Sequence, residues 1–171
     1  MTILDIRLIP DPILRKKAEE VEGPSDEIIT LLDDMAETMY NARGFGLAAN
    51  QVGVLKRLIV MDCSTNEEEP NLLKMINPEI ITSTNEKSEL EEGCLSIPEH
   101  KSNVVRPSKV EVSYMNVNGE TEKLKAEGLL SACVQHEIDH LNGILFIDHI
   151  SRLKRDMIIR KVKKQLRENE K

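Results

Sequence analysis

The sequence predicts an α+β fold, in which short, mostly antiparallel strands surround a central helix and a further helix ends the chain. Three patterns support this class. Apolar and polar residues alternate over residues 110–117, and Asn118-Gly119 then supplies a strong hairpin signal. Residues 129–142 are predicted to form a buried helix that ends at Gly143, and residues 151–165 an amphipathic helix.

The first part of the chain is predicted to contain two helices and a loop. Pro12 suits the first turn of a short helix that continues through residues 18–20. Ser25 is a candidate N-cap for a second helix, and Gly44 is its predicted stop. The apolar residues that recur at helical spacing behind Ser25 are Ile28, Leu31, Leu32, Met35 and Met39. Residues 44–51 are expected to be a loop or an extended segment.

The remaining elements are strands and the last helix. Residues 57–62 form a predicted buried strand, and the acidic residues 66–70 a solvated loop. A second strand covers residues 73–82, with an interruption near Asn77-Pro78, and residues 121–126 return as the partner of residues 110–117. In the last helix, the side expected to dock on the core carries Leu153, Met157, Val162 and Leu166.

Length and charge limit the class of protein. A chain of 171 residues suits one domain that spans residues 1–171. The formal net charge of -7 argues against general nucleic-acid binding by the whole chain. Residues 151–171 nevertheless hold nine Lys or Arg against three Asp or Glu, so a basic C-terminal helix follows an acidic body.

Cysteine content and the N-terminus bear on location. The three cysteines are an odd number without a repeating spacing, which does not suggest a disulfide framework. The first residues lack the basic start and apolar run of a signal peptide, and no apolar stretch is long enough to cross a bilayer. We therefore expect a soluble, cytoplasmic protein without a membrane partner.

The most specific local pattern is the sequence His-Glu-Ile-Asp-His at residues 136–140. Helix positions four apart share a face, so His136 and His140 can direct their imidazoles at one metal ion. Glu137 lies beside them, close enough to reach a water molecule at the metal without being a ligand. Two chance histidines on a solvated helix are the alternative, but the chain has only four histidines. The central helix of the predicted fold is therefore a metal-binding HExxH helix.

The third ligand is not fixed by this motif. A metzincin protease would need a third histidine at position 146, where this chain has Phe146, and a downstream glutamate ligand is poorly supported because the last helix is basic. Upstream, Cys94 offers a thiolate that leaves one position open for water, although a buried free cysteine is the commoner case. Cys63 lies in a strand-like segment and is interpreted as packing. Cys133 shares the face of His136 and either lines the site or packs in the core.

Residues 44–51 contain small residues that let the backbone approach a ligand, and Gln51 offers an amide that can stabilise an oxyanion. Together, three segments resemble the motifs of the peptide deformylase family. They read GFGLAANQ at residues 44–51, EGCLS at 92–96 and QHEIDHLNG at 135–143, and residues 8–21 are similar to the opening of that family. The resemblance covers essentially the whole chain, and the three motifs in this order are highly specific.

The resemblance implies a metal site and a reaction. Cys94, His136 and His140 would bind one divalent ion, Fe²⁺ in most of the family and often Zn²⁺, Ni²⁺ or Co²⁺ in preparations. The reaction would be hydrolysis of the N-formyl group from the formyl-methionine of nascent polypeptides, with release of formate. Glu137 would carry the proton, while the Gln51 amide and the Leu95 N–H would stabilise the oxyanion.

The resemblance also implies a substrate site. An apolar pocket for the methionine side chain would be lined by Phe45, Leu90, Leu129, Ala132 and Cys133, with Glu92 and Gly93 beside the substrate. The backbone at Gly46 would leave room for a formyl hydrogen but little for the methyl of an acetyl group. Where many relatives carry Arg, this chain has Lys101, a less directional donor to the peptide.

Partners and competing functions complete the expectations. The basic helix would contact the ribosome through Lys154, Arg155, Lys161, Lys164 and Arg167, or else it only packs on the core. The alternatives are an HExxH metallo-endopeptidase, a non-enzymatic relative that binds the ribosome, and a structural zinc protein, which would need a fourth ligand. His100 and His149 have no partner pattern and are interpreted as surface or structural residues.

Overall fold

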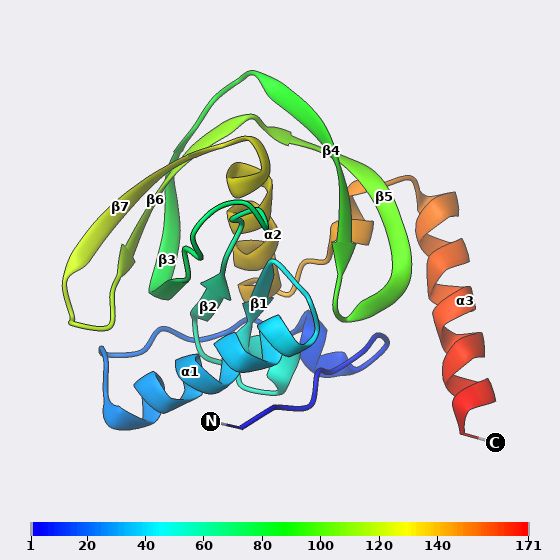
Figure 1. The fold of residues 1–171 in the computed structure, drawn as a ribbon. Coiled ribbons are helices and arrows are strands. Elements are labelled where there is room, and N and C mark those ends of the chain that lie inside the picture. The colour runs from blue at the N-terminus through cyan, green and yellow to red at the C-terminus, as the bar shows by residue number, and fades with distance from the viewer. Residues whose placement is uncertain (1, 171) are drawn as a thin grey trace.

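Helix α2 (Gly128–Leu141) lies at the centre of the molecule, between two antiparallel sheets (Figure 1). The structure is a computed structural model, and it describes residues 2–170. Nine of the 14 residues of α2 are buried, and they include His136, Glu137 and His140, so this helix carries polar side chains into the interior. The predicted α+β class and the central helix are confirmed.

The larger sheet has five strands in the order β1-β2-β3-β6-β7. They are β1 (Gly46–Ala48), β2 (Leu58–Met61), β3 (Leu73–Ser83), β6 (Lys109–Met115) and β7 (Thr121–Glu127). The predicted hairpin is present, because β6 pairs with β7 and Gly119 has a φ of 83° in the turn. β3 is interrupted as predicted, since Asn77 has a φ of 52° and the register with β6 shifts between Ile76 and Glu79.

A second sheet contains only β4 (Lys87–Cys94) and β5 (Ile97–Pro107), and sequence reasoning missed both strands. The turn between them is Leu95-Ser96. In β4 only Glu92 is buried, so no alternation of apolar residues marks this strand. Its position instead depends on pairing with β5 and on packing beside α2.

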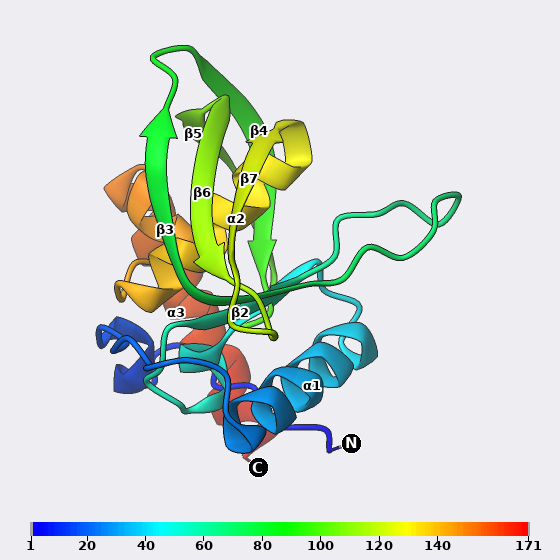
Figure 2. The ribbon, with the colours of Figure 1, turned by 90° about the vertical axis from the view of Figure 1, so that its left-hand side faces the viewer.

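Helices α1 (Asp26–Asn41) and α3 (Arg152–Asn169) flank this core (Figure 1). Ser25 caps α1 as predicted, accepting a hydrogen bond from the Ile28 N–H, and α1 packs against β1 and β2. Ser151 caps α3 in the same way. The acidic loop between β2 and β3 extends away from the body, and its residues 66–70 are exposed as predicted (Figure 2).

Two predicted helix boundaries were wrong. The short helix is a 3-10 helix of four residues, Pro12–Arg15, because the following backbone bonds elsewhere: the Ala18 N–H donates to the Leu141 carbonyl. The stop of α1 is Arg43 rather than Gly44, since Arg43 has the left-handed φ of 58°. Gly44 is needed for space, because a Cβ there would lie 2.7 Å from a methyl carbon of Leu95.

The buried side of α3 agrees with the prediction only in part. Leu153 is 76% exposed and Met157 41% exposed, whereas Ile158 and Val162 are buried against Phe146 and β5. Val162 was predicted to dock and does so, and Leu166 is half-buried against the same cluster, so the prediction was wrong at Leu153 and Met157 and missed Ile158. No helix within residues 2–170 is both long and apolar enough to cross a membrane.

Candidate metal centre

Three side chains from two distant segments converge at the core of the molecule. Cys94 lies at the end of β4, and His136 and His140 lie on one face of α2. The Nε2 atoms of the two histidines are 3.2 Å apart, and the Cys94 Sγ is 3.3 Å from the His140 Nε2. A tetrahedral ion with nitrogen and sulfur ligands needs donor separations of about 3.3–3.6 Å. The three donors therefore fit a divalent metal ion of this geometry.

Protonation in the metal-free protein agrees with a site built for positive charge. Burial disfavours charge on His136, yet the Cys94 thiol and the Glu92 carboxylate raise the pKa of His136 well above its usual value. Burial, followed by the charge on His136, lowers the pKa of His140. Of the two imidazoles, His136 is therefore favoured in its charged form and His140 in its neutral form.

Buried partners hold the ligand His136 in place. Its Nδ1 lies 2.9 Å from Glu92 Oε1, and Arg106 clamps both oxygens of Glu92 at 2.6 and 2.9 Å. Burial alone would raise the Glu92 pKa, but hydrogen bonds from His136 and Arg106 lower it to about 2. Glu92 is therefore a carboxylate at neutral pH, and an anionic acceptor fixes the tautomer that leaves Nε2 free to bind a metal.

Glu137 is buried next to the donor set but takes no part in it. Burial raises the pKa of Glu137 to about 7. Its Oε1 has no hydrogen-bond partner within residues 2–170, so this oxygen is free to meet a bound molecule. The carboxylate packs against Gly46 of β1, where a Cβ would lie only 2.5 Å from Glu137 Oε2. A glycine at this position is what allows Glu137 to fit.

Gln51 and the β4–β5 turn form the opposite edge of the site. The Gln51 Nε2 lies 3.5 Å from Cys94 Sγ and donates to the Ser96 hydroxyl at 3.0 Å, while its Oε1 accepts from the Ala48 N–H. The amide is thus held rigidly with one N–H towards the sulfur. Leu95 lies in the turn that follows Cys94, which brings its backbone to the same edge.

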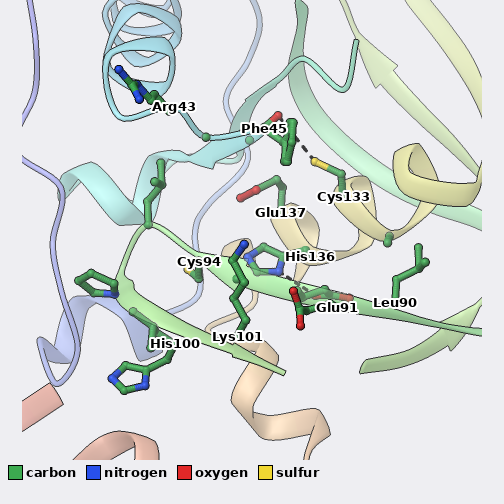
Figure 3. Close-up of a pocket in the computed structure, with 18 of the residues that line it drawn as sticks. Arg43, Phe45, Leu90, Glu91, Cys94, His100, Lys101, Cys133, His136 and Glu137 are labelled. Atoms are coloured by element: carbon green, nitrogen blue, oxygen red, sulfur yellow. Dashed lines mark hydrogen bonds and ion pairs between the residues drawn. The ribbon is translucent and has the colours of Figure 1, made fainter. Parts of the chain in front are cut away.

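A pocket of about 520 Å³ opens onto these groups (Figure 3). Of the predicted site residues, all but His140 line it: Phe45, Gly46, Gln51, Leu90, Glu92, Gly93, Cys94, Leu95, Leu129, Ala132, Cys133, His136 and Glu137. Phe45 and Leu129 are 55% and 46% exposed, and the Cys133 thiol donates to the Phe45 carbonyl oxygen at 3.7 Å. Lys101 also lines the pocket.

Sequence reasoning missed several residues of this region. His100, expected to be a surface or structural residue, lines the pocket together with Arg43, Glu91 and Glu99. His149, expected to have no partner, lies 2.9 Å from Asp139. Arg106 and Ser96 were not singled out, although both are buried polar residues beside the donor set. A buried arginine or serine carries no sequence signal that distinguishes it from those on the surface.

Comparison with known proteins shows the family of this chain. The model of the polypeptide deformylase family matches residues 3–156. The chain belongs to this family. It is 50% identical to the peptide deformylase of Agrobacterium fabrum, with 98% of each chain covered, and 52% identical to that of Rhizobium meliloti, with 96% of this chain and 94% of the relative covered.

Solved structures of the family share the fold. The crystal structure of peptide deformylase from Ehrlichia chaffeensis matches with a TM-score of 0.94 and 43% identity, over 98% of this chain and 99% of that chain. A second structure of that enzyme, in complex with actinonin, matches with a TM-score of 0.92 and 45% identity, over 96% and 98% of the chains. The resemblance inferred from the three motifs is confirmed, and the chain is an enzyme of this hydrolase family.

Proposed function

We propose that this protein removes the N-formyl group from the formyl-methionine of nascent polypeptides and releases formate. The observation that carries the proposal is the convergence of Cys94, His136 and His140 on one point, with Glu137 buried beside them at the base of an open pocket. Membership of the deformylase family and the actinonin complex of a relative support deformylation of nascent peptides.

The metal would be held by Cys94, His136 and His140, and we propose Fe²⁺ as the physiological ion, with Zn²⁺, Ni²⁺ or Co²⁺ able to replace it. Bound there, a divalent ion supplies Lewis acidity and lowers the pKa of water. The mixed thiolate and imidazole donor set supports a transition metal rather than Mg²⁺ or Ca²⁺, which prefer oxygen ligands.

Glu137 is proposed as the proton carrier. Its carboxylate accepts a proton from the attacking water and then passes it to the amine that leaves. A pKa of about 7 in the metal-free protein suits both acceptance and release of a proton near neutral pH. Burial excludes bulk water from this carboxylate, so the transferred proton stays in the site.

Gln51 and Leu95 are proposed to stabilise the oxyanion that develops on the formyl carbon. The Gln51 amide is fixed by its bonds to Ala48 and Ser96, so it needs no reorganisation during the reaction. The Leu95 backbone N–H would be the second donor, from the turn beside Cys94. Gly46 would leave little space for the methyl of an acetylated substrate.

The methionine side chain would occupy the apolar part of the pocket. Phe45 and Leu129 have apolar surface exposed at its wall, and Leu90, Ala132 and Cys133 complete the lining. Glu92 is expected to act on the substrate only indirectly, because its carboxylate is already engaged by Arg106 and His136. Gly93 lies beside Cys94 on the strand that borders the pocket.

We propose the ribosome as a partner through the outer face of α3. Lys154, Lys161, Lys164 and Arg167 are exposed on α3, whereas Arg155, which was also expected to contribute, is half-buried. Such a basic face suits the phosphates of ribosomal RNA. The free cysteines fit a reducing compartment, which supports the cytoplasm as the site of the reaction.

Formate release from formyl-Met-Ala-Ser, measured with wild type and with Glu137→Ala, tests the proposal. The variant should retain stoichiometric metal but lose about 10²–10⁴-fold in rate, because Glu137 transfers protons and does not bind the ion. Full turnover by the metal-loaded variant would contradict the role of Glu137. Cleavage of an internal peptide bond, with no formate released, would instead favour the metallo-endopeptidase.

A further inference from the structure

His149 lies outside the pocket but is connected to the candidate metal centre. It ends the 3-10 helix Phe146–His149, and its side chain is 34% exposed. Its Nε2 is 2.9 Å from Asp139 Oδ2. Asp139 lies on α2 between the two histidines of the motif, so this bond joins the surface segment to the helix that carries the metal ligands.

From Asp139 a continuous series of hydrogen bonds leads to His136. Asp139 Oδ2 also accepts from a terminal nitrogen of Arg106 at 2.9 Å. The other two guanidinium nitrogens of Arg106 bond both oxygens of Glu92, and Glu92 Oε1 accepts from His136 Nδ1 at 2.9 Å. The series thus runs His149, Asp139, Arg106, Glu92 and His136, with every link at 2.9 Å or less.

The middle of this series is buried, so its geometry depends on both carboxylates. The side chain of Arg106 is 6% exposed, and its planar fork can bond Glu92 and Asp139 together only in one orientation. If Asp139 turned towards solvent, a guanidinium N–H would be left unpaired in the interior. Arg106 would then follow Asp139, and its hydrogen bonds to Glu92, the partner of His136, would lengthen.

We propose that His149 is a positioning residue for the ligand His136, acting through Asp139, Arg106 and Glu92. The Asp139 side chain is 20% exposed, so water competes for its carboxylate. By donating to Oδ2, His149 keeps that oxygen beside α2, where Arg106 also binds it. The inference rests on the proposed role of His136 as a metal ligand.

The segment that carries His149 has separate anchors. Arg15 forms two bonds to Asp148, at 2.6 and 3.1 Å, and the Leu145 N–H donates to the same carboxylate. Phe146 is buried and its ring stacks on His136, with centroids 6.1 Å apart. A change of the His149 side chain therefore removes one hydrogen bond and leaves the backbone of the segment fixed.

Three variants of His149 distinguish the effect of its hydrogen-bond donor from the effect of its side-chain size. His149→Phe keeps a ring but has no donor. His149→Gln places an amide N–H close to the position of Nε2 and so can still reach Asp139. His149→Asn places its amide nearer the backbone, at the position of Nδ1. It serves as the matched control, because this amide cannot reach Asp139.

The measurement is the rate at which Zn²⁺-loaded protein releases its ion to a chromogenic chelator, together with the visible spectrum of the Co²⁺-loaded form. Removal of a direct partner of a metal ligand costs about 10–100-fold in affinity. His149 is separated from the ligand His136 by three residues, so a smaller effect is expected. His149→Phe and His149→Asn should release Zn²⁺ about three- to tenfold faster than wild type and shift the Co²⁺ absorption bands. His149→Gln should match wild type in both readouts, and all three should unfold at wild-type temperature within a few degrees.

Two results would overturn the inference. One is release of Zn²⁺ from His149→Phe at the wild-type rate; the other is equal release from His149→Gln and His149→Phe, which would assign the effect to packing. Cys94→Ser tests the underlying metal site in the same assay. A wild-type protein that binds Zn²⁺ no better than Cys94→Ser would overturn the proposed function, whereas an intact site with an unaffected His149→Phe would overturn this inference alone.

Discussion

Replacement of Gly46 by Ala tests whether close packing of β1 on α2 sets the position of Glu137. Gly46 lies in a strand, where alanine is allowed by the backbone. A Cβ there would meet the Oε2, Cδ and Cγ atoms of Glu137 at 2.5, 2.8 and 2.9 Å. Relief to a normal contact of about 3.5 Å requires the carboxylate to move by about 1 Å.

The expected size of the effect follows from that displacement. A shift of about 1 Å in a catalytic group costs on the order of 10²-fold in rate. Overpacking in a buried site lowers the free energy of unfolding by about 1–3 kcal/mol. Gly46→Ala should therefore lose about 10²-fold in kcat/KM on a formyl-methionyl peptide while it retains metal, because no metal ligand is among the atoms met.

The assay is a double-mutant cycle with Glu137→Ala, with Gly23→Ala as the matched control. A Cβ at Gly23 would have an ordinary 3.6 Å contact with Met115, so that variant should behave like wild type. The three Glu137 atoms that a Cβ at Gly46 would contact all lie beyond the Cβ of Glu137, so they are absent from Glu137→Ala. In that background Gly46→Ala should lower neither the rate nor the stability any further. If Gly46→Ala lowers stability equally in both backgrounds, the contact with Glu137 is not the cause.

Three further predictions concern pH, oxygen and the last helix. In the metal-free protein, burial raises the Glu137 pKa from 4.5 to about 7, so the stability linked to its protonated form is complete below pH 4.5 and lost as pH rises to about 7. The free energy of unfolding of wild type, relative to Glu137→Gln, should fall by up to about 3 kcal/mol over that window in chemical denaturation; a flat difference would refute it. Fe²⁺-loaded protein should lose activity in air, since the ion and the Cys94 thiolate are both oxidisable, and indefinite full activity with Fe²⁺ bound would contradict this. Reversal of charge at Lys161, Lys164 and Arg167 should spare activity on a short formyl peptide, because the proposed catalytic and metal-binding residues end at His140, yet weaken co-sedimentation with ribosomes at low salt. Unchanged sedimentation would leave α3 as a packing element only.

Local patterns in the sequence were sufficient where the geometry is itself local. Histidines four residues apart on a helix must share a face, so the spacing alone pairs His136 with His140. The hairpin at Gly119 and the cap at Ser25 likewise depend on neighbouring residues alone. By contrast, the buried side of α3 was predicted correctly only at Val162 and Leu166, since Met157 and Ile158 are both apolar and only docking on the protein decides between them.

The sequence alone was thus enough to predict the α+β class, the HExxH helix, the family and many of the residues that line the pocket. How those residues are held depends on long-range contacts that appear only in the folded chain. The strands β4 and β5 carry no apolar alternation, and 30 acidic and 23 basic side chains offer too many pairings for the sequence to select the one that joins Glu92, Arg106 and Asp139. Long-range packing makes that selection, because it buries these charges together, and buried charges are stable only when paired.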